Sequence, residues 1–352
     1  MRIDRLELTN FRNYQSFEIE PSDGINLILG RNAIGKTNLL EAIYLITVGK
    51  SFRTLKASEM IRLGESSANI RATVESGGYS DELKIILNLN QKNEYIMNSD
   101  SINIKNYAGD FSCVIFSPND LNMIKLSPGE RRKYIDSLIE KVSPVYKYNL
   151  AKYRKILFER NKLLKRPNEE LLKVYDFQLA SYGVKILFER LKYIKEIEEF
   201  AKKHYSRLSQ GSKLKITYLS TVKFLKDKME QTFMEILLEQ REKDFESRFT
   251  TVGPHRDDLD FKINEMSAKS FASQGETRSI VLALKLAEMD FLEKFNKRRP
   301  ILLLDDVFSE LDKTRAMYLS QSLDNMQTFI TSTNLNEDSF LIDSNKINVE
   351  RL

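Results

Sequence analysis

Residues 25–46 read INLILGRNAIGKTNLLEAIYLI. The stretch begins with an apolar run that predicts a buried strand, and it ends with a run that predicts a helix from about Thr37 to Ile46. Between them, residues 30–37 fit the pattern G-x-x-x-x-G-K-[ST] in full. Glycines at these places let the loop fold back, so that successive backbone N–H groups point at an anion. The stretch therefore predicts a strand, a phosphate-binding loop and a helix.

The polar side chains of the loop suit a nucleoside triphosphate. Lys36 would reach the β- and γ-phosphates, and the Thr37 hydroxyl would ligate magnesium. The predicted nucleotide-binding residues are the loop and the residue after it: Gly30, Arg31, Asn32, Ala33, Ile34, Gly35, Lys36, Thr37 and Asn38. Kinases, GTPases and motor ATPases share this loop, so it predicts nucleotide binding and no particular reaction.

A second motif narrows the choice among these classes of nucleotide-binding protein. Four aliphatic residues, Ile301–Leu304, predict a buried strand, and Asp305 and Asp306 follow at its end. We expect Asp305 to hold Mg²⁺ and Asp306 to orient or deprotonate the attacking water. Lys36 and Asp305 are 269 positions apart. A compact kinase or GTPase does not need that separation, whereas an ATPase core split by an insertion does.

The segment between the two motifs differs in charge and composition. Residues 121–250 hold 29 basic and 18 acidic residues, a net charge of +11, while the rest of the chain sums to −6. Residues 128–249 contain three glycines, and apolar residues recur at helical spacing on both sides of a break at residues 166–168. This pattern predicts two amphipathic helices that pack antiparallel as an arm. The basic excess fits either a polyanionic partner such as nucleic acid or a lysine-rich, merely solvated surface.

Composition excludes several classes of protein. No stretch approaches the roughly 18 apolar residues that a membrane-spanning helix needs. The N-terminal residues MRIDRLEL interleave charges, so we expect no secretory leader. With the single cysteine Cys113 and two histidines, His204 and His255, the 352-residue chain offers neither an intrachain disulfide nor a zinc cluster. A reducing cytoplasm is the expected compartment.

The remaining segments predict an α/β fold. Residues 2–8 alternate as a strand does, residues 68–97 form two alternating runs around Gly77 and Gly78, and residues 113–116 form a further buried strand. Strand and helix patterns return at Thr250 and continue to the end of the chain.

Two short segments near the second motif are similar to parts of ABC-type ATPases. The segment SQGETRS, residues 273–279, resembles their signature loop, which contacts the γ-phosphate held by another subunit. The resemblance assigns that role in trans to Ser273, Gln274, Gly275 and Glu276. Ser309 and Asp312 lie in a segment that resembles the D-loop of the same class.

Longer segments resemble the RecF family of bacterial recombination mediators. The similar segments are LELTNFRNY (6–14), GRNAIGKTNLLEAIYLI (30–46), SFRT (51–54), FSPNDL (116–121), GERRKYID (129–136), YRKILFERNKLLK (153–165), VGPHRDDL (252–259), SQGETRS (273–279) and LLLDDVFSELD (302–312). The resemblance implies an ABC-type ATPase head with mixed sheet, Lobe I, over residues 1–125 and 246–352. It also implies an inserted α-helical arm, Lobe II, over residues 126–245.

The same resemblance implies a function. Family members bind ATP and Mg²⁺, form an ATP-dependent homodimer on gapped, single- or double-stranded DNA, and hydrolyse ATP weakly. They act in DNA repair, replication restart and the SOS response by loading RecA at gaps, with RecO and RecR as partners, in the cytoplasm at the nucleoid. Two alternatives stay open: an ATP-regulated nuclease of the overcoming-lysogenisation-defect type, and a P-loop kinase of a small molecule. The nuclease would need a downstream acidic metal site, and residues 313–352 contain no second acidic cluster.

The chain departs from the common ABC pattern at three places. The second acid is Asp306, where transporters and SMC heads carry glutamate, and its shorter side chain is consistent with slow turnover. The switch histidine is absent, and hydroxyl residues occupy positions 331–333. No glutamine follows residues 113–116; Ser117 and Asn119 stand there. The γ-phosphate sensors therefore remain open.

The remaining candidates each have two interpretations. Arg12 and Asn13 follow the first strand and lie either near the nucleotide or in an exposed turn. His255 makes either a structural hydrogen bond or a contact with nucleotide or DNA. Several basic residues either face DNA phosphates or belong to solvated or ion-paired surfaces: Arg53, Arg131, Arg132, Lys152 and Lys155. Such contacts would bind the DNA backbone without reading sequence.

Overall fold

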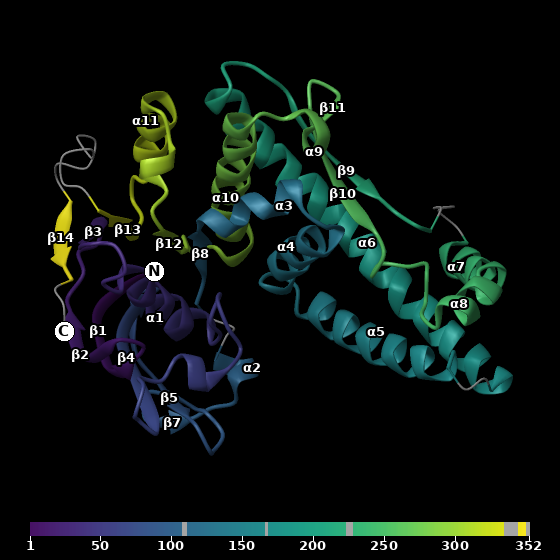
Figure 1. Ribbon diagram of the computed structural model, residues 1–352, viewed down its shortest axis with the longest axis horizontal. Helices are drawn as coiled ribbons and strands as arrows, with labels where there is room; N and C mark the ends of the chain where they lie inside the picture. The colour runs from purple at the N-terminus through teal and green to yellow at the C-terminus, as the bar shows by residue number, and fades with distance from the viewer. Residues whose placement is uncertain (108–110, 166–167, 223–227, 334–343, 350–352) are drawn as a thin grey trace. The chain divides into compact units, whose positions relative to one another are not determined.

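The computed structural model describes residues 1–107, 111–165, 168–222, 228–333 and 344–349 (Figure 1). The chain divides into two compact units, the first made of Met1–Asp120 with Lys285–Leu352 and the second of Leu121–Leu284. The boundary falls within helix α10 (Gln274–Asn296), so each unit holds part of this helix. The first unit is thus discontinuous in sequence. These boundaries differ from those of the two predicted lobes, whose limits stay a prediction.

The first unit contains an antiparallel sheet in the order β2-β1-β4-β5-β6-β7. Its strands are β1 (Arg2–Phe11), β2 (Tyr14–Ile19), β4 (Ser67–Ser76), β5 (Tyr79–Asn88), β6 (Glu94–Met97) and β7 (Asp100–Ser101). Ser76 pairs with Tyr79, so Gly77 and Gly78 alone form the turn between β4 and β5. Both glycines have positive φ, 63° and 83°, as the tightest hairpin turns require. The predicted hairpin is confirmed.

A second sheet of the same unit is parallel, in the order β14-β3-β13-β12-β8. Its strands are β3 (Ile25–Leu29), β8 (Cys113–Phe116), β12 (Ile301–Leu304), β13 (Thr328–Ser332) and β14 (Asn345–Asn348). The predicted strands at β3, β8 and β12 are confirmed. Parallel strands are covered on both faces, which explains why β12 is four buried aliphatic residues in a row. The carboxyl ends of β3, β13 and β12 lie side by side, and the two predicted motifs follow two of these ends.

Helix α1 (Lys36–Val48) forms the centre of the first unit. It contacts β1, β4 and β5 of one sheet and β8 and β13 of the other. A helix covered on both sides is apolar around its whole circumference, and Leu39–Ile46 is fully buried, including Glu41. Short elements complete the unit: η1 (Ala57–Glu59), α2 (Ile104–Tyr107), η2 (Pro118–Leu121), η3 (Phe308–Glu310) and α11 (Lys313–Gln321).

The second unit is built on a pair of long helices, α5 (Pro144–Leu163) and α6 (Glu169–Leu208), which run side by side (Figure 1). At about 1.5 Å per residue, the 40 residues of α6 span about 60 Å. The two predicted helices are confirmed; residues 166–167 of the predicted break lie outside the described residues. The other helices of this unit are α3 (Asn122–Lys125), α4 (Pro128–Glu140), α7 (Met229–Glu239), α8 (Arg241–Ser247) and α9 (Ala268–Phe271).

A three-stranded sheet in the order β11-β10-β9 also belongs to the second unit. Strand β9 (Leu214–Leu219) pairs antiparallel with β10 (Asp258–Ile263), which pairs with β11 (Met266–Ser267). The sequence analysis did not predict β9, because its six residues stand in a lysine-rich, helix-dominated segment and their partner strand comes about 40 residues later. Within the described ranges, no helix has the length and apolar content that crossing a membrane requires.

Candidate nucleotide-binding site

The phosphate-binding loop connects β3 to α1 through two residues in the left-handed region. Ala33 has φ 62° and Gly35 has φ 119°. A Cβ atom at Gly35 would lie 2.6 Å from the side-chain nitrogen of Asn13, closer than real contacts allow. Glycine is therefore required at position 35 both by the backbone conformation and by the packing of Asn13.

Lys36 folds back over the loop. Its Nζ donates hydrogen bonds to the carbonyl oxygens of Gly30, at 2.7 Å, and Arg31, at 3.2 Å. Desolvation lowers the pKa of Lys36, while the nearby charges of Asp306 and Asp305 act in the opposite direction. A buried cation beside two carboxylates and a loop of backbone N–H groups is suited to binding an anion.

The parallel sheet brings the two motifs together. Thr37 Oγ1 donates to Asp305 Oδ1 at 2.9 Å, across a sequence separation of 268 residues. Thr331, on the strand between β3 and β12, donates its hydroxyl to the same carboxylate oxygen at 3.0 Å. Burial raises the pKa of the Asp305 carboxyl, and the hydrogen bonds from Thr37 and Thr331 oppose this rise.

Asp306 is held by the same threonine. Its backbone N–H donates to Thr331 Oγ1 at 2.8 Å, and its φ of 55° turns the chain sharply at the end of β12. Ser309 Oγ donates to the Asp306 carbonyl at 2.8 Å, which ties the predicted D-loop to the second acid. Thr331 therefore connects both acids, a role that the sequence analysis left open among the hydroxyls of residues 331–333.

Asn13 contacts the loop directly. Its side-chain nitrogen donates to the Ile34 carbonyl at 2.7 Å, and its side-chain oxygen accepts from Asn38 at 2.8 Å. Of the two interpretations of Asn13, the structure favours the place beside the loop.

Arg12 and Arg53 converge on Glu41, a buried carboxylate that the sequence analysis missed. Arg12 donates to both Glu41 oxygens, at 2.8 and 2.7 Å, and Arg53 donates to one of them at 3.1 Å. Ser51 Oγ donates to the other at 2.5 Å. Arg53 also donates to the Asn38 side chain at 2.7 Å, so this cluster borders the loop. The signal for Glu41 was present, because it is the one charged residue in the apolar run of residues 39–48.

The predicted magnesium ligands fit that ion. Mg²⁺ prefers hard oxygen donors and takes one or two protein ligands beside the phosphates of its nucleotide. The Thr37 hydroxyl and the Asp305 carboxylate are such donors, lie 2.9 Å apart, and stand next to Lys36 at the start of α1. A cation beside Asp305 would also stabilise the ionised form that burial disfavours.

A cavity of about 630 Å³ lies against the outer side of the loop. Its wall consists of residues from the end of β3, from the loop and from the end of β14: Leu29, Gly30, Arg31, Asn32, Ala33, Ile34, Asn348 and Val349. The volume is in the range of small-molecule sites, so the loop has room for a ligand beside it.

The predicted signature segment begins helix α10. Ser273 Oγ accepts from the Glu276 N–H at 3.2 Å, and Glu276 Oε2 accepts from the Ser273 N–H at 2.8 Å. This is a capping box, which fixes the first turn of the helix. Asp312 similarly accepts from the Arg315 N–H at 2.9 Å and caps α11. Ser273, Gln274, Ser309 and Asp312 are exposed, whereas Gly275 and Glu276 are half-buried, and both segments are ordered by their own hydrogen bonds.

The predicted DNA-contacting residues differ in accessibility. Arg131 is 2% exposed and is bound by Asp258 at 2.6 Å and by two backbone carbonyls, so we leave it out of any DNA surface. Arg132 is half-buried and donates to the Asp257 carbonyl at 2.8 Å. Lys152 and Lys155 are exposed on α5, and Lys152 lies 5.4 Å from the centre of the Tyr148 ring. Arg53 is exposed beside the loop.

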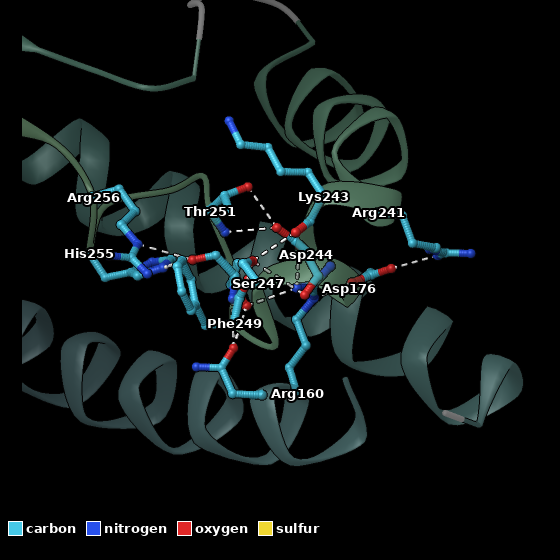
Figure 2. Close-up of polar contacts among 12 residues, drawn as sticks. Arg160, Asp176, Arg241, Lys243, Asp244, Ser247, Phe249, Thr251, His255 and Arg256 are labelled. Carbon is cyan, nitrogen blue, oxygen red and sulfur yellow. Dashed lines mark hydrogen bonds and ion pairs between the residues drawn. The ribbon is translucent and has the colours of Figure 1, made fainter. Parts of the chain in front are cut away.

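His255 belongs to a polar network of the second unit (Figure 2). Its Nδ1 lies 2.8 Å from the Tyr153 hydroxyl, and its Nε2 lies 3.0 Å from the Thr250 carbonyl. In the same network, Arg160 is fully buried and binds Asp176 at 2.6 Å and Asp244 at 2.7 Å. These contacts join α5, α6, α8 and the turn before β10, which favours the structural interpretation of His255.

The fold and this site together define the class of protein to which the chain belongs. A helix that follows a phosphate-binding loop lies between an antiparallel and a parallel sheet, and the two acids directly follow strand β12. This is the architecture of ABC-type ATPase heads. A solved SMC head bound to a domain of ScpA has the same fold, with a TM-score of 0.59 at 17% identity over 98% of this chain and 93% of that one.

Closer similarities identify the family. Residues 2–345 match the family described as RecF/RecN/SMC N terminal domain. The DNA replication and repair protein RecF of Clostridium tetani is 40% identical over 95% of this chain and 94% of its own, and that of Streptococcus thermophilus is 40% identical over 97% and 94%. A solved structure of the recombination mediator protein RecF has a TM-score of 0.90 at 34% identity, covering 99% of this chain and 96% of that one. The chain belongs to the RecF family of DNA replication and repair proteins.

Proposed function

We propose that this chain is an ATP-dependent DNA-binding clamp that acts in recombinational repair and replication restart. The observation that carries the proposal is the hydrogen bond between Thr37 and Asp305, because it joins the two halves of an ATP·Mg²⁺ site across the inserted unit. Relatives of the family have been solved with ATP and with ATPrS, at 35% and 34% identity to this chain. Similarity to RecF proteins over nearly the full chain favours this function over the nuclease and the kinase.

ATP hydrolysis in this site depends on four side chains. Lys36 binds the β- and γ-phosphates, Thr37 and Asp305 hold Mg²⁺, and Asp306 orients the attacking water. The metal ion supplies charge neutralisation at the phosphate oxygens. Through its hydroxyl, Thr331 orients the Asp305 carboxylate and holds the backbone of Asp306, so it acts as a positioning residue for the reaction. We infer a weak, DNA-dependent ATPase that uses hydrolysis as a switch.

A second copy of the chain completes the site in our proposal. The start of α10, where Ser273 and Gln274 are exposed and Gly275 and Glu276 are half-buried, is a helix N-terminus, where an anion is favoured. The γ-phosphate held by one subunit would then become part of the interface with the other. Ser309 and Asp312 would border the same interface. Because ATP binds more tightly to the associated state than to the monomer, it shifts the population toward the dimer, and hydrolysis reverses the shift.

DNA would lie against the basic arm, Lobe II. Lys152 and Lys155 are the exposed candidates on α5, with Arg132 and Arg53 as further phosphate contacts. Contacts of this kind bind the backbone and weaken steeply with salt. In the family's role, the clamp loads RecA at gaps together with RecO and RecR. That role places the protein in the cytoplasm at the nucleoid.

Replacing the loop lysine tests the proposal. Lys36→Met should abolish both ATP binding and the ATP-dependent dimer, because the triphosphate loses its main cation. Light scattering with and without ATP and Mg²⁺, in the presence and absence of a DNA duplex, measures the dimer. Lys56→Met serves as the matched control, since Lys56 is exposed and pairs only with Glu59 at 3.4 Å among the ion pairs of the described chain. A dimer that persists in Lys36→Met would contradict the switch.

A further inference from the structure

Helix α6 presents a second apolar face, which is open to solvent. Val174, Phe177, Phe188 and Leu191 are 52%, 59%, 63% and 39% exposed. Ser181 and Val184 stand between them and are half-buried. These six residues, which we name the α6 stripe, follow one another at intervals of three, four, three, four and three positions. They therefore line one side of the helix over about 26 Å.

The α6 stripe is separate from the face that holds the second unit together. The buried side of α6 contains another set of apolar residues at helical spacing: Leu172, Leu179, Ile186, Leu187, Tyr193 and Ile197. At 100° per residue, the middle of the stripe lies about 165° from the middle of this buried set. A helix with a single core-facing side would carry polar residues where the stripe stands. The stripe is thus not explained by packing within the described chain.

The spacing of the α6 stripe indicates the shape of its occupant. Alternation of three and four is the spacing of the seam residues in a coiled coil, where a second helix supplies interlocking side chains. A nucleic acid would need a series of stacking rings, but Val174, Val184 and Leu191 offer no stacking surface. The apolar face therefore fits a helix of a protein partner.

The charges beside the α6 stripe indicate the sign of that partner. Lys173, Lys185, Lys192 and Lys195 are exposed, and each lies three or four positions from a stripe residue. The two acids between positions 171 and 195 are engaged elsewhere: Asp176 is buried against Arg160, and Glu189 accepts from Ser143 Oγ at 3.1 Å. A second copy of α6 would oppose lysine to lysine, which is unfavourable at these flanking positions.

We propose that the α6 stripe is a docking site for an amphipathic helix of a partner protein that carries apolar residues at the seam and acidic residues beside them. The acidic flanks select the partner, and burial of the apolar side chains supplies affinity.

Two synthetic peptides test the proposal with the full-length chain. Both contain about 21 residues with leucine at the seam positions; one carries glutamate and the other lysine at the flanking positions. Fluorescence anisotropy should show the glutamate peptide binding at least about tenfold more tightly than the lysine peptide. No saturable binding of the glutamate peptide up to about 1 mM would overturn the proposal.

Variants then locate the binding. Phe177→Glu with Phe188→Glu should weaken binding of the glutamate peptide at least about tenfold. Phe158→Glu on α5 is the matched control, because Phe158 is equally exposed, at 59%, but its ring is covered by Lys162 at 4.3 Å. Circular dichroism checks that both variants fold. Equal losses in both variants would contradict a site on the α6 stripe.

Charge reversal supplies an independent result. Lys185→Glu with Lys192→Glu should reverse the preference, so that the lysine peptide binds more tightly than the glutamate peptide.

Binding of two other occupants, a second copy of the chain and a nucleic acid, is measured in parallel. If Phe177→Glu with Phe188→Glu instead abolished self-association without nucleotide, or abolished binding of a single-stranded oligonucleotide, the occupant would be a second copy or a nucleic acid, and the proposal would be wrong.

Discussion

Thr331 is the residue through which the two acids of the site are coupled. Its hydroxyl donates to Asp305 and accepts from the Asp306 N–H, at 3.0 and 2.8 Å. ABC-type ATPases commonly carry a histidine after the corresponding strand. Here a buried hydroxyl orients Asp305, the proposed metal ligand, and fixes the backbone of Asp306, the acid proposed to orient water, at the same time.

Removing that hydroxyl should slow ATP hydrolysis while leaving the fold intact. Thr331→Val keeps the shape but leaves the Asp306 N–H without its acceptor, so we expect the ATPase kcat to fall about 10- to 100-fold and the Mg²⁺ requirement to rise. Steady-state ATPase assays over a Mg²⁺ titration measure both. The exposed Thr333→Val is the matched control and should retain activity. Unchanged kcat in Thr331→Val would show that the acids need no such coupling.

His255 makes the stability of the second unit depend on pH. Its pKa is lowered to about 4, mainly by desolvation of the ring, while the hydrogen bond with Thr250 acts in the opposite direction. In the unfolded chain a histidine titrates near 6.5. Between these values the unfolded state binds a proton that the folded state does not, so the free energy of unfolding falls as the pH drops from about 6.5 toward 4.

The expected slope is at most about 1.4 kcal/mol per pH unit. His255→Gln should remove this part of the pH dependence, although it also costs stability at pH 7.5 through altered contacts with Tyr153 and Thr250. Urea unfolding of both proteins at pH 7.5 and pH 5 measures the difference. An equal loss of stability between the two pH values in both proteins would exclude His255 as the titrating group.

At the residue scale, the sequence predicted the side chains that belong to linear motifs. Lys36, Thr37, Asp305 and Asp306 were identified because the loop and strand patterns fix their neighbours. Thr331 and Glu41 could not be assigned in this way, because their roles depend on partners that only the folded sheet and the buried helix bring near.

At the scale of single elements, the sequence of helix α6 meets three structural requirements. One face is buried in the second unit, the opposite face carries the α6 stripe, and Gly183 lies where Phe233 of α7 packs against the helix. A Cβ atom at Gly183 would lie 2.4 Å from the Phe233 ring and 3.2 Å from the Tyr153 ring. The glycine therefore allows α7 to approach α6.

Gly183→Ala should destabilise the second unit. Overpacking of a core typically costs about 1–3 kcal/mol, and the better helix propensity of alanine offsets about 1 kcal/mol of that. Phe233→Leu in the Gly183→Ala background should restore part of the loss, because the smaller side chain vacates the space. Urea midpoints of the two single variants and the double variant test this coupling. Additive losses would mean that the two residues do not compete for space.

The sequence predicted elements with a repeating or clearly bounded pattern better than elements without one. The helical periodicity of α5 and α6 extends over many turns, and the hairpin of β4 and β5 has its two glycines at the turn. Strand β9 has six residues and no local turn signal, so its extended conformation depends on pairing with β10, which the local sequence does not show.

For the whole molecule, the central claim is that ATP joins two copies, each of which completes the other's site. Ser273→Arg should leave ATP binding by the monomer nearly intact while it blocks association, since Ser273 lies at the exposed start of α10. Lys36→Met should lose binding in its own loop but keep an intact signature segment. Each variant alone should therefore have no dimer-dependent ATPase activity.

Mixing these two variants is the most direct measurement. A mixed dimer would contain one intact site, formed by the loop of Ser273→Arg and the signature segment of Lys36→Met. We predict that an equimolar mixture with ATP, Mg²⁺ and DNA regains up to about half of the wild-type ATPase activity, since neither variant pairs with itself and each mixed dimer holds one intact site of two. Activity in the mixture no greater than the sum of the two variants alone would contradict a site shared between subunits.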